Sequence, residues 1–167
     1  LIKAIKASKL NPEKDVLISL DVASSEFYNK NQYHIKSDNK KFKNIEMVDY
    51  LKHITDNYPI FSIEDGCAED DWKHWTMLNQ QLGKSTLLIG DDLFVTNCKR
   101  LKRGISEKAA NGILIKPNQI GTLSETLDAI NLAKESSIEN VISHRSGETE
   151  DNFIADLSVA SNSKYIK

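Results

Sequence analysis

Cysteine is scarce in this chain of 167 residues, which contains Cys67 and Cys98 alone. The two residues form neither a CxxC motif nor the paired spacing of a zinc site, so the sequence argues against both kinds of centre. Two cysteines by themselves do not establish a disulfide. We therefore expect both thiols to be free, as they are in a reducing cytosol.

Long apolar runs and an excess of charge of one sign are also missing. No stretch approaches the ~20 apolar residues that span a bilayer, and no signal peptide is visible. The chain begins at Leu1 rather than Met, which leaves open a targeting segment upstream. Basic residues number 22 and acidic residues 24, for a net charge of −2. Without a strongly basic stripe, we do not expect nucleic acid as the main partner.

The overall composition is ordinary for a globular protein, with 40% apolar and 28% charged residues. The length suits one domain with a sizeable core. Six short apolar stretches predict strands, and each ends on a polar residue. They are LISLD ending at Asp21, IFSIE at Glu64, TLLIGD at Asp91, ILIK at Lys116, VISH at His144 and YIK at Lys167. Segments with helical patterning lie between them, and this repetition predicts an α/β domain with a parallel sheet covered by helices.

Several boundaries can be predicted from local signals. Glu125 lies three residues after Thr122, as in a capping box, and Gly83 and Gly112 are expected to close two helices. The run at residues 16–22 predicts a continuously buried strand. Residues 27–35 predict a small extended excursion and residues 37–44 a polar loop.

Three successive predicted strands end in carboxylates, at Asp21, Glu64 and Asp91. Ligands of parallel sheets sit at the carboxyl ends of the strands, where these side chains converge if the sheet is curved. Three carboxylates with water completing the shell suit Mg²⁺, and the lack of Cys or His among them argues against zinc. An aspartate at a strand end can instead cap the following helix, and this alternative stays open for each acid alone.

Lys116 follows the predicted strand at residues 113–115 and precedes Pro117. At a partly buried strand end near other cations, a lysine should have a lowered pKa, which would suit it to abstract a proton. The alternatives are a phosphate-binding lysine and an ion pair with a neighbouring acid, and position alone favours neither side.

Residues 144–151 gather polar groups at the next strand end. Arg145 can bind an anion through two hydrogen bonds, and Ser146 can donate another. The N-terminus of the following helix also favours negative charge. His144 could bind substrate or be a satisfied core histidine, and Lys167 is a second candidate cation for the same ligand.

The other histidines, at 34, 53 and 74, lie away from the strand ends and are expected at the surface. Trp72 and Trp75 are expected to pack their helix rather than to form a ligand platform.

The strand ends and the segments around them carry recognisable motifs. They are LDVASSEFY, SIEDG followed by AEDDW, GDDLFVTN, ILIKPNQIGTLSET and SHRSGETED. In this order and spacing they resemble enolase, the glycolytic enzyme that dehydrates 2-phosphoglycerate to phosphoenolpyruvate, and SIEDG and GDDLFVTN are closer to the bacterial type. The motif ILIKPNQIGTLSET is highly specific, and the resemblance covers essentially the whole chain. It implies a partial TIM-type (β/α) barrel, about six βα units of the eight-stranded enolase C-terminal domain.

The resemblance also implies roles for individual residues. Asp21, Glu64 and Asp91 correspond to the ligands of the first Mg²⁺, which holds the substrate carboxylate. Lys116 corresponds to the general base that removes the proton next to that carboxylate.

The resemblance implies further residues that bind the substrate. Arg145 and Ser146 correspond to the phosphate-binding pair, and His144 and Lys167 to further substrate contacts. The implied substrate-binding set is Glu64, Asp91, Lys116, His144, Arg145, Ser146 and Lys167.

Complete enolases have parts that the resemblance does not find in these 167 residues. They include an N-terminal domain, the first barrel strands, the final barrel helix, the glutamate that acts as general acid and the loops that help hold a second Mg²⁺. We therefore expect the isolated chain to lack turnover and to self-associate through open strand edges. The resemblance further implies that the protein is cytoplasmic, although some enolases also occur at the cell surface or are secreted. It also implies that the full-length protein forms a homodimer or a larger oligomer.

Two other functions remain open at this point. One is a truncated, non-catalytic enolase-derived protein that binds partners or acts at a surface. The other is a different member of the wider superfamily that acts on another carboxylate substrate, although Arg145 and Ser146 disfavour it because that pair suits a phosphate.

Overall fold

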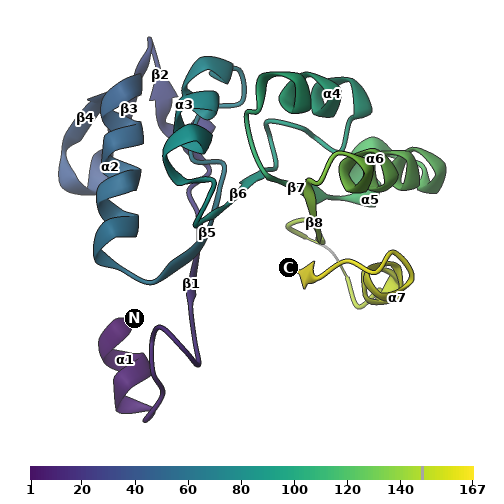
Figure 1. Ribbon diagram of the computed structural model, residues 1–167, viewed down its shortest axis with the longest axis horizontal. Coiled ribbons are helices and arrows are strands. Elements are labelled where there is room, and N and C mark those ends of the chain that lie inside the picture. The colour runs from purple at the N-terminus through teal and green to yellow at the C-terminus, as the bar shows by residue number, and fades with distance from the viewer. Residues whose placement is uncertain (148) are drawn as a thin grey trace.

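A computed structural model describes residues 1–147 and 149–167 of the chain, and Glu148 of the SHRSGETED motif lies outside the described residues. Six parallel strands form its main sheet (Figure 1). They are β1 (Ile18–Asp21), β5 (Ile60–Glu64), β6 (Leu87–Gly90), β7 (Gly112–Ile115), β8 (Glu139–Ile142) and β9 (Tyr165–Ile166). All six predicted strands are therefore present.

The order of the strands in this sheet is β1-β5-β6-β7-β8-β9, so each strand pairs with the next one along the chain. A doubly wound sheet would reverse direction at a switch point, whereas a TIM barrel adds each strand to the same side. The fold is a curled, partial TIM-type (β/α) barrel, as predicted.

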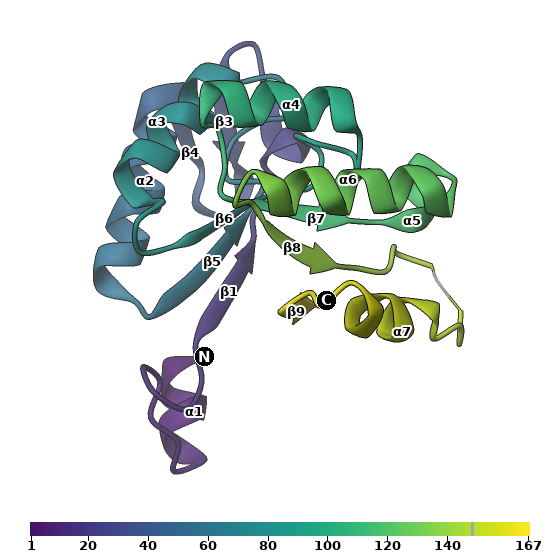
Figure 2. The same ribbon diagram turned by 45° about the vertical axis from the view of Figure 1, so that its right-hand side comes forward.

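Helices cover the outer face of the sheet, where α2, α3, α4 and α6 form a curved layer (Figure 2). The helices that follow the strands are α2 (Asn44–Asn57), α3 (Trp72–Leu82), α4 (Cys98–Glu107), α6 (Leu123–Glu135) and α7 (Phe153–Ala160). Two short helices, α1 (Ile2–Ala7) and α5 (Pro117–Ile120), complete the set in the described part of the chain.

Side-chain caps explain where two of these helices begin. The Asn97 side chain accepts hydrogen bonds from the first turn of α4, and the Thr122 hydroxyl accepts one from the Glu125 backbone, which confirms the predicted cap. The prediction that Gly112 closes α4 is wrong. Lys108 ends that helix in the left-handed conformation, and Gly112 begins β7.

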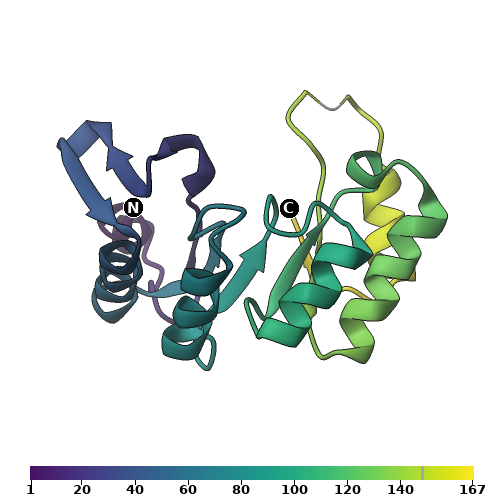
Figure 3. The same ribbon diagram turned by 90° about the horizontal axis from the view of Figure 1, so that it is seen from above.

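A small antiparallel sheet, β2 (Tyr28–Asn29), β3 (Gln32–Ile35) and β4 (Lys40–Lys43), follows β1. Two 3-10 turns flank β2 and β3, η1 (Ser24–Phe27) and η2 (Lys36–Asp38). The sheet lies at the opposite end of the molecule from α7 (Figure 3). The predicted polar loop is wrong for residues 40–43, because they pair with β3.

The main core lies between the sheet and its helices and includes Trp75, Leu78 and Phe94, all without exposed surface. Burial of Trp72 and Trp75 confirms that these residues pack their helix. A second, smaller cluster of Ile89, Leu114 and Val141 lies apart from that core.

β1 departs from the predicted continuous burial, because its residues alternate between half-buried and exposed. Its pairing explains the difference, since β1 has a neighbouring strand on one side only among the described residues. No described helix is long and apolar enough to cross a membrane.

Candidate active site at the carboxyl ends of the strands

The acids Asp21, Glu64 and Asp91, here called the carboxylate triad, come from the ends of three adjacent strands. Asp21 is the register partner of Glu64 in the β1–β5 ladder. Glu64 in turn lies opposite Ile89 of β6, two residues before Asp91. The parallel register therefore brings all three side chains to one edge of the sheet.

Lys167 joins two members of the triad across the curl of the sheet. Its Nζ donates to Asp21 Oδ2 and to Glu64 Oε1, both at 2.8 Å. Asp21 and Lys167 are 146 positions apart in the chain, so this contact depends on the last strand approaching the first ones. Residues of β1, β5 and β9 line a cavity of about 240 Å³, and Phe61 and Tyr165 are among these lining residues.

The charges of this contact influence each other. Burial raises the pKa of Glu64, while its hydrogen bond to Lys167 acts in the opposite direction. Burial acts to lower the pKa of Lys167, but the hydrogen bonds to Asp21 and Glu64 outweigh it and leave the pKa raised. Lys167 thus acts as a cation held between two carboxylates.

Asp91, the third member of the triad, has a different partner. Lys116 Nζ donates to Asp91 Oδ2 at 2.5 Å, and both side chains are largely buried. This is the ion pair that the sequence left open as an alternative for Lys116. The backbone N–H of Lys116 donates to Thr96 Oγ1, which fixes the start of the side chain at the end of β7.

Asp65 was missed by the sequence reasoning. Its carboxylate lies with those of Asp91 and Asp92 in a cluster whose ligand atoms are all within 4.8 Å, the one such group among the described residues. The triad itself is not gathered this tightly. Burial raises the pKa of Asp65 to about 7, although its hydrogen bonds to the backbone of Asp92 and Asp91 oppose the shift.

The donor set at this edge fits Mg²⁺. Asp91 Oδ1 is buried and, within the part of the chain that the structure describes, has no hydrogen-bond partner. Such an orphaned carboxylate oxygen is costly unless a cation or water satisfies it. The ammonium of Lys167 between Asp21 and Glu64 also marks a place of cation affinity. All of these ligand atoms are carboxylate oxygens, which Mg²⁺ prefers.

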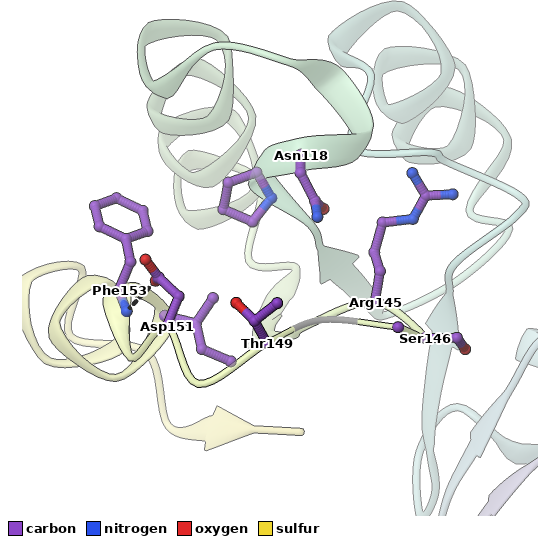
Figure 4. Close-up of a pocket in the computed structure, with 9 residues that line it drawn as sticks. Asn118, Arg145, Ser146, Thr149, Asp151 and Phe153 are labelled. Atoms are coloured by element: carbon purple, nitrogen blue, oxygen red, sulfur yellow. Dashed lines mark hydrogen bonds between the residues drawn. The ribbon is translucent and has the colours of Figure 1, made fainter.

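The predicted anion-binding residues lie in a separate, open cavity of about 520 Å³. Arg145 and Ser146 line it together with Asn118, and His144 Nδ1 contacts the Arg145 carbonyl at 2.9 Å. The Arg145 side chain extends toward the side of the cavity that carries Asn118, whereas Ser146 points away (Figure 4). This cavity and the one beside Lys167 share no lining residue.

His74 is not the surface residue that the sequence suggested. Its Nδ1 lies 2.6 Å from Asp71 Oδ1, and the side chain is largely buried. The Asp71 carboxylate also accepts from Tyr33 and Asn44, so His74 belongs to a polar network behind the loop that follows β5. His53 is exposed, as predicted, and His34 is half-buried.

A parallel sheet wound strand by strand, with acids and lysines at the carboxyl ends of its strands, defines a TIM-barrel-type domain whose candidate site lies at that face. Comparison with known families matches the chain over residues 1–167 to the enolase C-terminal TIM barrel domain. The chain belongs to this family, which confirms the resemblance found in its motifs.

Proposed function

We propose that the chain forms the barrel of an enolase, a lyase that reversibly dehydrates 2-phosphoglycerate to phosphoenolpyruvate. The observation that carries the proposal is the Lys116–Asp91 pair at the carboxyl ends of adjacent strands, in a chain that matches the enolase family throughout. A lysine beside a cation-binding carboxylate is the arrangement needed to remove a weakly acidic proton next to a substrate carboxylate.

The carboxylate triad would hold Mg²⁺. Bound there, the metal would supply positive charge against the charge that develops on the substrate carboxylate as the proton leaves. Glu64 and Asp91 lie beside Lys167 and Lys116, so the same edge offers both negative ligands and cationic substrate contacts.

Lys116 would accept the proton at Nζ. Its Nζ donates to Asp91 Oδ2, so the amine lies beside a carboxylate of the triad that would hold the metal. The backbone hydrogen bond to Thr96 holds the start of the Lys116 side chain at the end of β7.

Arg145 and Ser146 would bind the substrate phosphate, with His144 and Lys167 as further contacts. A guanidinium matches the geometry of phosphate oxygens, and a hydroxyl adds one more donor.

The test is turnover of 2-phosphoglycerate by the complete natural protein, with Lys116→Ala as the decisive variant. Loss of a general base should lower kcat about 100- to 10,000-fold. Exchange of the substrate's α-proton with deuterated solvent should fall with it, because this step precedes loss of the hydroxyl. Lys84→Ala is the matched control, since Lys84 is exposed near the start of β6, at the opposite end of the sheet.

Two results would count against the proposal. A wild-type protein that binds Mg²⁺ but leaves 2-phosphoglycerate unchanged would remove the assigned reaction. Unchanged proton exchange in Lys116→Ala would remove Lys116 from the role of base.

A further inference from the structure

Asp65 lies at a junction between strands, and it has no role in the reaction proposed above. It follows Glu64 directly at the end of β5, is 3% exposed and has a backbone φ of 45°. Non-glycine residues seldom adopt this left-handed conformation, although aspartate tolerates it better than most. A buried carboxylate in a rare backbone conformation calls for a compensating set of contacts.

The contacts of Asp65 reach the strands on both sides. Its N–H donates to the Ile89 carbonyl of β6 at 3.0 Å. Its carbonyl accepts from the N–H of Ser24 at 3.2 Å and from the Ser24 hydroxyl at 2.5 Å, just after β1. One residue therefore links the strand ends that carry the carboxylate triad.

The side chain adds the link to Asp91. Asp65 Oδ1 accepts the N–H of Asp91 and Oδ2 accepts that of Asp92, both at 2.9 Å. These two hydrogen bonds tie the backbone N–H groups of Asp91 and Asp92 to one carboxyl group, so they fix the turn at the end of β6. Since both oxygens are already engaged with the backbone, the carboxylate serves the turn rather than standing free as a metal ligand.

We propose that Asp65 is a positioning residue that sets the mutual geometry of the carboxylate triad and thereby its affinity for a divalent cation. This inference rests on the proposed function. Asp65 makes no contact with substrate in the scheme above, and it acts through the backbone of Asp91 and through the junction with Ser24.

The test is a calorimetric titration of the complete protein with Mg²⁺, comparing wild type with Asp65→Asn. Asparagine keeps the shape but presents an amide N–H to one of the two backbone N–H groups, so one hydrogen bond is lost. The expected result is a Kd for Mg²⁺ weaker by about 10- to 100-fold, as for other residues that orient metal ligands. In turnover, the Mg²⁺ needed for half-maximal rate should rise by a similar factor, with kcat largely restored at saturating Mg²⁺.

Asp92→Asn is the charge-matched control. It removes a negative charge from the same cluster and leaves both backbone hydrogen bonds to Asp65 in place. We expect a clearly smaller change in Kd for this variant. Equal weakening in the two variants would mean that charge alone sets the affinity, and the positioning role would fall.

Ser24→Ala covers the case in which Asp65→Asn does not fold. It removes only the hydroxyl bond to the Asp65 carbonyl, and it should weaken Mg²⁺ binding several-fold in a folded protein. Wild-type affinity in folded Asp65→Asn, or in folded Ser24→Ala if the first variant is unfolded, would overturn the inference while leaving the proposed function intact. A wild-type protein that does not bind Mg²⁺ would overturn both.

Discussion

A hydrogen in place of a side chain at Gly104 lets helix α4 lie directly against Phe94. A methyl group built at Gly104 would lie 2.6 Å from Phe94 Cζ and closer still to Cε1. Phe94 has no exposed surface and cannot move aside freely. Overpacking of this kind costs about 1–3 kcal/mol, against a gain in helix propensity of at most about 1 kcal/mol.

We therefore expect Gly104→Ala to lower the free energy of unfolding by about 1–2 kcal/mol. Urea denaturation followed by circular dichroism measures this change. Lys102→Ala is the control on the same helix, because Lys102 is exposed and its replacement meets no buried ring. A Gly104→Ala protein as stable as wild type would show that the helix can shift away from Phe94.

The two free cysteines should differ in reactivity. Cys67 is fully buried and Cys98 is half-buried, and burial raises the pKa of both thiols. A raised pKa leaves less thiolate at a given pH, so labelling should be slow near neutral pH and accelerate as the pH rises. We expect a chromogenic disulfide reagent to modify Cys98 in the native protein and Cys67 only after unfolding.

Cys98→Ser provides the check on this assignment, because it should abolish native-state labelling and leave the labelling of the unfolded chain. Rapid modification of Cys67 in the folded Cys98→Ser protein would mean that the loop after β5 opens readily.

The residues of the site could be predicted only so far. Asp21, Glu64, Asp91 and Lys116 were identified because each ends or follows a short apolar run, which the sequence displays directly. Asp65 was missed because its role depends on its left-handed backbone and on hydrogen bonds to the turn after β6, 26 residues later. Neither is visible in local patterning.

At the scale of elements, the β2–β3–β4 sheet is fastened to the loop after β5 by Tyr33. The buried Tyr33 hydroxyl accepts the N–H of Ala68 at 2.9 Å and donates to Asp71 Oδ2 at 3.1 Å. Removing it would leave a buried N–H without a partner, which costs about 1–3 kcal/mol. We expect Tyr33→Phe to destabilise the protein by that amount and to speed amide hydrogen exchange at Ala68.

Tyr58→Phe is the matched control, because the Tyr58 side chain is exposed and its hydroxyl can be replaced by solvent. It should leave both stability and exchange unchanged. Unaltered exchange at Ala68 in Tyr33→Phe would show that the small sheet does not hold this loop.

The elements themselves could be predicted well where periodicity was strong. All six strands of the main sheet and the longer helices between them were found from apolar runs and helical spacing, whereas the short helix α5 was not predicted. β4 was missed because three of its four residues are lysines and Phe42 alone is apolar. Its strand conformation comes from pairing with β3, which is a tertiary contact.

At the scale of the whole molecule, the sheet is curled but open. Among the described strands, β1 and β9 each have a neighbour on one side only. Leu17 beside β1 is 47% exposed, and Ile166 in β9 is 53% exposed. Unpaired backbone groups next to exposed apolar side chains form a template for association with a second chain.

The polypeptide of residues 1–167, expressed alone, should therefore self-associate in a concentration-dependent manner. Sedimentation velocity over about a hundredfold range of concentration would detect this, and charged residues at strand edges are known to block such pairing. We expect the double variant Leu17→Lys and Ile166→Lys to shift the distribution toward monomer.

Val159→Lys separates edge pairing from general stickiness. Val159 is 83% exposed but lies on helix α7 rather than on a strand, so the variant removes apolar surface of the same kind without placing a charge on a strand edge. If Val159→Lys dissociates the assemblies as well as the double variant does, exposed apolar area rather than edge pairing drives association. If the wild-type chain stays monomeric throughout, the curl of the sheet already protects its edges, and Lys167, by joining β9 to Asp21 and Glu64, is the contact best placed to do so.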